Sequence, residues 1–356
     1  MVLYQERPRI LFILIRRGTL MKFTISALFS LLLIGLLLSG CGNSHSHDTT
    51  LLAPSPENRL VIYTSHRDAV YEPIIREFEA RTGIWVQVKT GGTIELLDLI
   101  AQGDSGCDLL FGGGTESLES HKELFSPYTS PLAANIVSTY QSDTGHWTPF
   151  SFLPIVLAYN SKLVRLNPPS GWEDLLDTIW QGQIAFADPT VSASAYTALS
   201  TLLQLYAKEE NEIIMHRFLK NLNGEILPRS SSVVEQIAYG NCYIGVMLED
   251  EVIRSIREGY DVAMVFPKEG TSAVCDGLAV IANCAHEDNA RLFIDFVLGK
   301  DVQQYLITQC YRRSVLSELS TEETNTSFIP YDSDWSSQQQ ANILALWNDI
   351  LQEVMP

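Results

Sequence analysis

Basic residues are scarce in this chain, and their scarcity excludes several classes of partner. The 356 residues include 24 Lys and Arg against 42 Asp and Glu, which gives a net charge of −18. Residues 1–40 carry five basic residues and one acidic residue, so the charge of the remaining chain is −22. Such a chain is repelled by the phosphate backbone of nucleic acids and by anionic membrane surfaces. We therefore expect no nucleic-acid partner.

Motifs of common catalytic and metal sites are also missing. There is no Gly-x-Ser-x-Gly and no His-Glu-x-x-His, and residues 112–117 (GGGTES) lack the lysine of a phosphate-binding Walker loop. The cysteines show no Cys-x-x-Cys spacing, so neither a zinc site nor a disulfide framework is indicated. We expect a protein that is not an enzyme and that needs no cofactor or metal. The cysteines are Cys41, Cys107, Cys242, Cys275, Cys284 and Cys310, and the disulfide state of the last five stays open.

The apolar run near the N-terminus is typical of a signal peptide. Residues 25–40 (ISALFSLLLIGLLLSG) are uncharged and short for a membrane-spanning helix. The run ends in Leu38-Ser39-Gly40-Cys41, which resembles the bacterial lipobox, where signal removal leaves a diacylglycerol-modified cysteine. We predict a signal peptide over residues 1–40, in which 1–20 are an upstream extension, and a lipid on Cys41 that anchors the protein to the membrane. An uncleaved membrane anchor is the alternative.

The segment that follows is expected to be a tether. Residues 41–58 are mostly polar, end in a stretch with two prolines, and contain nothing that builds a core. The chain after the signal peptide is a little over 300 residues long, which is more than a single hydrophobic core usually supports. Two lobes are therefore expected.

Short apolar runs alternate with helical patterns after the tether. Residues 60–63 (LVIY) and 84–88 (IWVQV) are typical of strands, and each is followed by a polar or glycine-containing turn and a helical pattern. This alternation predicts an α/β fold with a parallel sheet flanked by helices. Ligands of such folds bind beyond the carboxyl ends of the strands, and the polar turns at 64–67, 90–93 and 112–115 fall at such positions.

Several segments of this region resemble one family, the periplasmic binding proteins of the ferric-iron, polyamine and phosphorylated-compound type. The resemblance extends from Arg59 to about Val315, and it implies an extracytoplasmic solute-binding protein of an ABC importer. It also implies the type II fold, in which two α/β lobes joined by a two-stranded hinge close on the ligand. The segments that carry it are 60–84, 108–119, 157–164, 169–199 and 279–306.

The resemblance also implies domain boundaries. The hinge crossovers are expected near 150–160 and 271–281. Lobe one would then comprise residues 59–150 plus 281–356 with the C-terminal helices, and lobe two residues 151–280. The family habit further implies a monomer.

The chain departs from the ferric members of the family at one place. Those members hold iron with two adjacent tyrosines on the second lobe, whereas the corresponding residues 245–252 read GVMLEDEV. We therefore expect no tyrosinate iron site. The carboxylates at 249–251 either contact a ligand or begin a solvated helix, where they stabilise the positive end of its dipole.

Four turns rich in hydroxyl groups or glycine are expected on the cleft: 64–66, 112–115, 192–194 and 230–232. Hydroxyls and backbone N–H groups at helix starts form a neutral cradle for an anion. Serine and threonine also cap helices at such positions, but their convergence favours an oxyanion site. The residues that we expect to contact the ligand are Ser65, His66, Gly113, Gly114, Thr115, Ser151, Ser192, Ser194, Tyr196, Ser232, Glu249, Asp250 and Asp276.

An anion cradle next to carboxylates favours a ligand with a phosphate or phosphonate at one end and hydroxyls or an amine at the other. We predict that the protein captures a small phosphorylated organic solute, a sugar phosphate or an aminophosphonate, and delivers it to an importer permease. Ferric-iron or polyamine binding on the same fold is the alternative within the family. A ligand-sensing domain without a transport role is the alternative outside it.

Overall fold

The computed structural model describes residues 54–103, 106–222, 226–320 and 326–354. The predicted signal peptide, Cys41 and the tether up to residue 53 lie outside these ranges. Within them, no helix is both long enough and apolar enough to cross a membrane. The residues from Ser55 onward form one compact unit.

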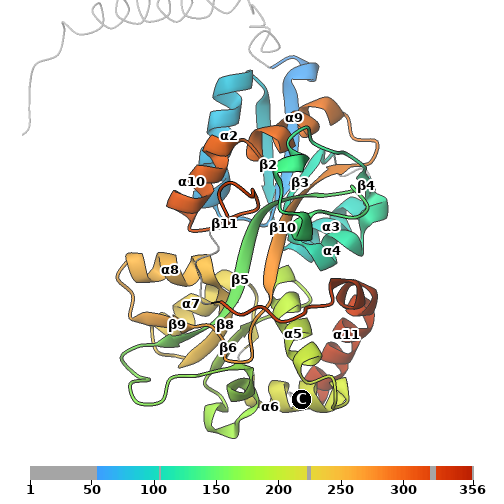
Figure 1. The fold of residues 1–356 in the computed structure, drawn as a ribbon. Helices are drawn as coiled ribbons and strands as arrows, with labels where there is room; N and C mark the ends of the chain where they lie inside the picture. Colours follow the sequence, from blue (N-terminus) through green and yellow to red (C-terminus); the bar gives the residue numbers. More distant parts are fainter. Residues whose placement is uncertain (1–53, 104–105, 223–225, 321–325, 355–356) are drawn as a thin grey trace, which may run out of the picture. The chain divides into compact units, whose positions relative to one another are not determined.

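Lobe one is built on three parallel strands, with β1 in the middle. β3 is buried at every residue, as expected for a strand covered on both faces. Helices on both faces complete the lobe, whose core includes Phe78, Phe111 and Phe293 (Figure 1). The elements are β1 (Arg59–Thr64), α2 (Asp68–Thr82), β2 (Trp85–Thr90), α3 (Thr93–Ala101), β3 (Leu109–Gly114), α4 (Thr115–Glu119), β4 (Phe125–Ser126), α9 (Glu287–Val297), α10 (Lys300–Cys310) and β11 (Arg313–Ser314).

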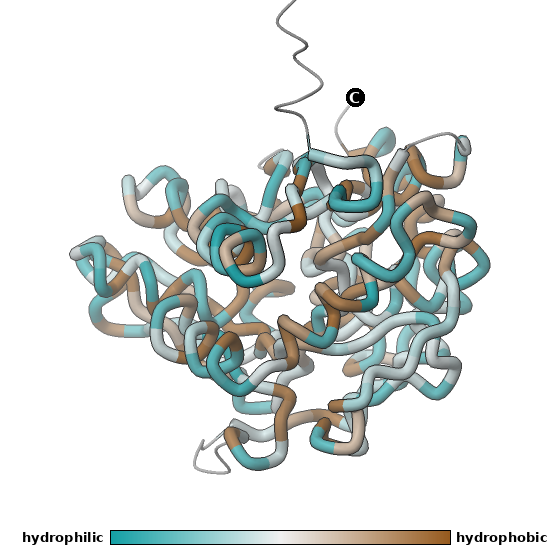
Figure 2. Tube along the Cα trace, turned by 90° about the horizontal axis from the view of Figure 1, so that it is seen from above, coloured by the Kyte–Doolittle hydropathy of each residue, from teal (hydrophilic) through white to brown (hydrophobic). Residues whose placement is uncertain are grey.

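Lobe two repeats this plan around β6, which pairs in parallel with β7 and β8. Its separate core contains Trp172, Phe186 and Phe218. In Figure 2 hydrophobic stretches run through the interior of the fold, while many outer turns are hydrophilic. The elements are β6 (Ile184–Ala187), α5 (Ala193–Leu205), α6 (Asn211–Leu222), β7 (Ile226–Leu227), α7 (Ser230–Ala238), β8 (Ile244–Leu248), α8 (Glu249–Arg257) and β9 (Val262–Val265).

Two long antiparallel strands, β5 (Thr148–Asn160) and β10 (Ala273–Ile281), run between the lobes. β10 pairs with β3 of lobe one, and the second half of β5 pairs with β8 and β9 of lobe two. Figure 1 shows both strands passing from one lobe to the other. The sheet is therefore mixed, which corrects the expectation of a parallel sheet: the chain that returns from lobe two through β10 runs against β3.

The C-terminal helix α11 (Ser333–Val354) corrects the expected grouping of residues 281–356 with lobe one. Its buried residues Ile343, Trp347 and Ile350 belong to the core of lobe two. Trp347 lies 5.9 Å, between ring centroids, from Phe186. The chain reaches lobe two because the segment before α11 pairs with the start of the second hinge strand, where Thr271 donates its N–H to the carbonyl of Ser327.

A buried carboxylate also joins α4 of lobe one to lobe two. Glu116 is 3% exposed and accepts hydrogen bonds from Tyr331 and from Thr197 of α5, the latter at 3.2 Å. Burial raises the pKa of Glu116 above its ordinary value, although both hydrogen bonds favour the ionised form. The contact between α4, α5 and the C-terminal segment is thus a second connection between the lobes besides the hinge strands.

The placement of α11 predicts the effect of truncating its central tryptophan. Trp347→Ala should lower the free energy of unfolding by roughly 3–5 kcal/mol, because the indole is fully buried against lobe two. Urea unfolding followed by circular dichroism measures the loss. Asn348→Ala on the exposed side of the same helix is the matched control and should change stability little. Equal stability of the two variants would contradict the packing of Trp347 in the core of lobe two.

Candidate functional site

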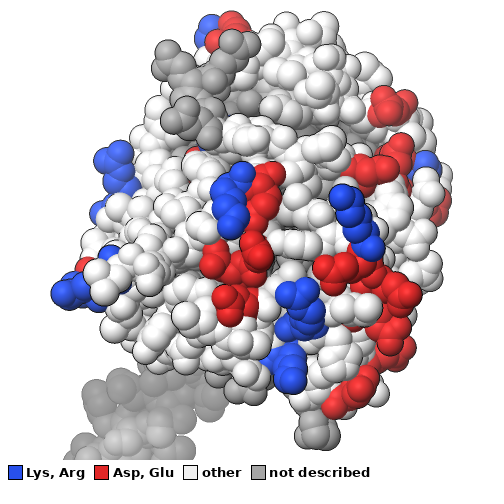
Figure 3. All heavy atoms as spheres, turned by 60° about the horizontal axis from the view of Figure 1, so that its bottom comes forward, with Lys and Arg blue, Asp and Glu red and all other residues white. Residues whose placement is uncertain are grey.

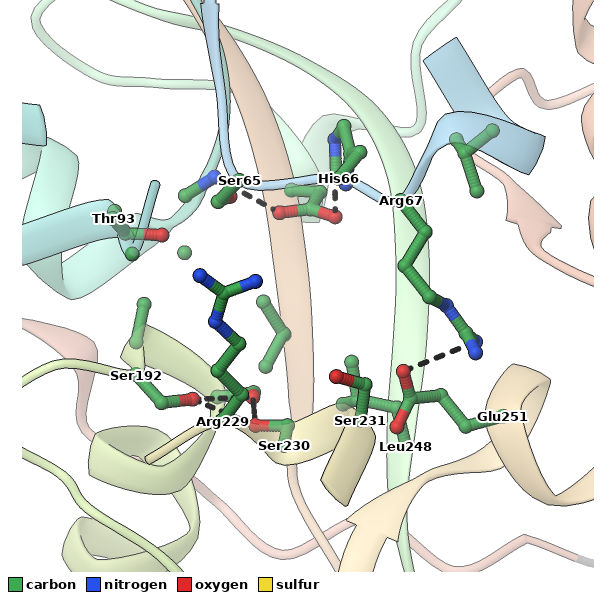
Figure 4. Close-up of a pocket in the computed structure, with 18 of the residues that line it drawn as sticks. Ser65, His66, Arg67, Thr93, Ser192, Arg229, Ser230, Ser231, Leu248 and Glu251 are labelled. Carbon is green, nitrogen blue, oxygen red and sulfur yellow. Dashed lines mark hydrogen bonds and ion pairs between the residues drawn. The ribbon is translucent and has the colours of Figure 1, made fainter. Parts of the chain in front are cut away.

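A cleft of about 480 Å³ lies between the lobes, at the carboxyl ends of the strands of lobe one (Figure 4). Lobe one contributes the turns that follow β1 and β2 and the last two residues of β3. Lobe two contributes the starts of α5, α7 and α8, and the hinge strand β10 forms part of the wall. The lining segments are 65–70, 90–93, 113–114, 191–194, 228–231 and 250–251, together with Leu248, Val274, Asp276 and Arg312.

The starts of five helices meet at this cleft. α2, α3, α5, α7 and α8 each have nine or more residues, and the first residue of each, or its immediate neighbour, lines the cleft. The N-terminus of a helix carries a partial positive charge and unsatisfied backbone N–H groups. Five of them on one cleft produce a potential that attracts an anion without requiring a lysine.

Three serine hydroxyls form a closed triangle on the lobe-two wall. Ser230 Oγ lies 2.7 Å from Ser192 Oγ and 2.8 Å from Ser194 Oγ, which are 3.1 Å apart. Ser192 also caps α5 by accepting a bond from the N–H of Ala195. Capping and an anion cradle are therefore compatible here, because a hydroxyl that accepts from the helix still has a proton to donate.

Three arginines line the cleft. Arg229 precedes α7, is exposed, and in Figure 4 its guanidinium extends from lobe two toward Thr93 and Ser65 of lobe one. Arg67 precedes α2, and its Nη2 lies 3.1 Å from Glu251 Oε1 of lobe two. Arg312 is buried and lines the cleft on the hinge side. The face in Figure 3 shows acidic side chains in bands, with basic ones beside them and no continuous basic patch among the residues described there.

Arg312 organises a buried network on the hinge. Its Nη1 donates to Asp276 Oδ2 of β10 at 2.8 Å and to Ser151 Oγ of β5 at 3.1 Å. Its Nε lies 3.5 Å from Asp250 Oδ2 of α8. Burial disfavours the charged guanidinium, but Asp250 and Asp276 raise the pKa of Arg312 by more, so it stays charged. Burial raises the pKa of Asp276, against the opposing effect of Arg312.

His66 is held beside this network in a neutral form. It is 9% exposed, and its ring packs edge-on against Phe111 and Phe150. Burial first, and then Arg312 and Arg67, lower its pKa well below the ordinary value. Nδ1 lies 3.4 Å from a guanidinium nitrogen, which only donates, so we assign the proton to Nε2.

Gly112 makes the close approach of the first and third turns feasible. Its φ of +120° is unfavourable for other residues, and a Cβ there would lie 2.8 Å from Ser65 Oγ. The glycine-rich end of β3 thus brings the β1 turn, with Ser65 and His66, against the backbone of Gly112. The N–H of Gly113 is in turn fixed by Asp276 at 3.1 Å.

The expected ligand contacts divide into two groups. Those that line the cleft are Ser65, His66, Gly113, Gly114, Ser192, Ser194, Asp250 and Asp276. The others lie behind it or elsewhere: Thr115, Ser151, Tyr196, Ser232 and Glu249.

Each exception has a structural reason. Tyr196 faces the opposite side of α5, where it is fully buried and donates to the carbonyl of Ser336. Glu249 is held by two hydrogen bonds from Arg313, at 2.8 and 2.9 Å. Ser151 is fully buried and bonds Arg312. In place of Ser232, the two serines before it line the cleft, because they occupy the first positions of α7. Thr115 begins the short helix α4 beyond the cleft.

The comparisons with known proteins are consistent with this geometry. A family model described as a bacterial extracellular solute-binding protein matches residues 98–334, about two thirds of the chain. The chain belongs to this family. It is similar to iron uptake protein A1 of Synechocystis sp., with 25% identity over 333 residues, covering 88% of this chain and 91% of that protein.

Two solved structures share the fold. The periplasmic binding protein AfuA from Actinobacillus pleuropneumoniae, with exogenous fructose-6-phosphate bound, has a TM-score of 0.76 and 23% identity, and covers 83% of this chain and 98% of that one. Iron-bound HitA from Pseudomonas aeruginosa has a TM-score of 0.70 and 20% identity, and covers 82% and 99%. The predicted family and the type II periplasmic-binding-protein fold are confirmed.

This family member is thus an extracytoplasmic solute-binding protein of the ABC-importer type. The relatives are binding proteins rather than enzymes, in agreement with the expectation from the missing catalytic motifs.

The Arg312 network predicts a large effect of removing its cation. Arg312→Met should lower the free energy of unfolding by roughly 3–5 kcal/mol, because Asp250 and Asp276 would stay buried without their partner. Urea unfolding at neutral pH measures the loss. Adding Asp276→Asn should recover part of it, whereas Arg257→Met on the exposed end of α8 serves as the control. A loss no greater than that of the control would show that the network contributes little.

Proposed function

We propose that this protein is a lipid-anchored receptor that captures a small phosphorylated organic solute between its lobes and hands it to an ABC importer. The observation that carries the proposal is the convergence of five helix N-termini and three serine hydroxyls on one cleft. A phosphoryl group presents several strong acceptor oxygens, and the helix N-termini and serine hydroxyls of the cleft offer mostly donors.

The serine end of the cleft suits the phosphoryl group. Ser192, Ser194 and Ser230 lie at the starts of α5 and α7, and Arg229 extends above them into the cleft (Figure 4). Thr93, at the start of α3, faces them from lobe one. Donors from both lobes around one anion would couple its binding to closure of the cleft.

The opposite end suits the organic part of the solute. Asp250 Oδ1 and Glu251 Oε2 are buried, and no donor in the described part of the chain reaches them. A carboxylate oxygen without a donor is costly when buried, and a sugar hydroxyl or an ammonium group of the solute would satisfy it. Inorganic phosphate alone would leave both oxygens unsatisfied. We therefore favour a sugar phosphate or an aminophosphonate.

Two relatives support a phosphorylated solute. The structurally similar AfuA was solved with fructose-6-phosphate bound. The phosphoglycerate transport regulatory protein PgtC of Salmonella typhimurium is 22% identical over 289 residues, which cover 79% of this chain and 69% of that protein.

Ferric iron is the alternative, because the relative from Synechocystis is named for iron uptake. Three observations weigh against it. The stretch at 245–252 contains no tyrosine pair, and its three carboxylates each meet an arginine. In the described ranges, no group of three or more His, Cys, Asp or Glu side chains is placed to hold a metal ion. The same arginines would repel a polyamine, because both carry positive charge.

The lipid anchor rests on the lipobox-like Leu38-Ser39-Gly40-Cys41 alone. It would keep the receptor at the outer face of the membrane, next to the permease.

A thermal-shift screen of the mature protein tests the solute class. Ligand that binds only the native state raises the melting temperature by mass action, by an amount that grows with its concentration over Kd. Hexose phosphates or aminophosphonates should raise it, while the matching unphosphorylated hexoses, ferric citrate and spermidine should not. A shift with ferric iron or spermidine alone would overturn the proposal.

Arg229 is the residue whose removal should affect binding most selectively. Arg229→Gln should weaken binding of the phosphorylated solute about 10- to 100-fold, the range for a lost charge-assisted hydrogen bond, without changing stability. Isothermal titration calorimetry measures the affinity. Arg257→Gln makes the same charge change on lobe two outside the cleft, so its affinity should remain that of the unmodified protein. Equal affinities of the two variants would show that Arg229 does not contact the solute.

A further inference from the structure

Helix α8 begins with three consecutive carboxylates, and each meets an arginine that belongs to lobe one. Glu251 Oε1 lies 3.1 Å from Arg67 Nη2, which precedes α2. The other two pairs involve the segment that follows α10. Asp250 Oδ2 lies 3.5 Å from Arg312 Nε, and Glu249 Oε2 lies 2.8 Å from Arg313 Nε.

Each pair crosses the boundary between the lobes. α8 packs with β8 and β9, and its Val252 belongs to the core of lobe two. Arg313 lies on β11, which pairs with β5 at Phe152, and Arg312 bonds both hinge strands. The pairs of Glu249 and Asp250 lie beside the hinge strands, because Leu248 pairs with Ile155 of β5. Arg67 belongs to the turn after β1 of lobe one, so a rotation of lobe two about the hinge moves Glu251 away from it.

The three pairs differ in their shielding from water. The side chains of Arg312 and Asp250 are 6% and 2% exposed, and those of Arg313 and Glu249 are 19% and 11% exposed. Arg67 is 36% exposed against 10% for Glu251, so this pair is the most accessible to solvent and salt. Its attraction is correspondingly the most sensitive to ionic strength.

Figure 4 shows the Arg67–Glu251 pair apart from the proposed phosphoryl end of the cleft. Arg67 and Glu251 lie at one end, while Ser192, Ser230 and Arg229 lie at the other. The carboxylate oxygens that face the arginines are occupied by the protein itself, while the serine end, Asp250 Oδ1 and Glu251 Oε2 are left for the solute.

We propose that these three ion pairs form an electrostatic clasp that holds the lobes together when no solute is bound. The clasp makes the solute-free protein populate a closed conformation, and opening separates Arg67 from Glu251 and exposes both charges to water. None of this depends on the identity of the solute, so the clasp and the proposed function fail independently.

The distance between two spin labels in the solute-free mature protein tests the clasp. Unnatural amino acids at Gln87 of β2 and Glu235 of α7 place one label on each lobe and leave the native cysteines untouched. Pulsed electron–electron double resonance should give mainly one short distance between the two labels at low salt. Arg67→Gln or Glu251→Gln should raise the open population about fivefold, the shift expected for a partly exposed ion pair.

The charge swap distinguishes a clasp from a local disturbance. Arg67→Glu combined with Glu251→Arg restores an attractive pair and should return the short distance, while either single change should open the cleft further. Arg76→Gln with Glu72→Gln removes an exposed pair within α2 and should leave the distance unchanged. A solute-free protein that is already open at low salt, or a swap that fails to restore closure, would overturn the proposal.

Discussion

The guanidinium of Arg312 is the interaction on which the rest of the structure depends. It bonds Ser151 of the first hinge strand and Asp276 of the second, and it faces Asp250 of lobe two. Asp276 in turn fixes the backbone of Gly113 at the floor of the cleft. One buried cation therefore links the two hinge strands to both walls of the site. Removal of Arg312 would leave the carboxylates of Asp250 and Asp276 buried without a partner. The loss of folding free energy would be far larger than the net contribution of the ion pairs to stability.

The chemistry of the cleft follows from how the chain enters its helices. In lobe one β1 and β2 each end in a turn that leads into a helix, and in lobe two the serine-rich segments begin α5 and α7. Because all of these helices start at the same boundary, their positive ends and capping hydroxyls gather there. An overall charge of −18 is thus compatible with an anion site, since the local field is set by dipoles and three arginines rather than by net charge.

Local patterns in the sequence predicted the elements, the two lobes and most of the cleft turns, because strand periodicity and turn residues act over a few positions. Tyr196 shows the limit of this reasoning: its helix is buried on nearly every side, so no polar face marks which residues turn toward the cleft. Arg312 was missed for another reason. It lies 36 residues after Asp276 in a segment without any motif, and only the packing of α10 on lobe one brings it to the hinge. The carboxylates at 249–251 were noticed, but their arginine partners come from segments more than 60 residues away.

Native mass spectrometry of the mature protein tests the central claim most directly, because it reports the stoichiometry and the identity of the bound solute at once. The protein would be offered a mixture of a hexose, its 6-phosphate, an aminophosphonate, inorganic phosphate and ferric citrate at equal concentration. The geometry of the cleft predicts a one-to-one adduct with the mass of the hexose phosphate or of the aminophosphonate, which Arg229→Gln should largely abolish. A dominant adduct with iron, or none with any phosphorylated compound, would contradict the account.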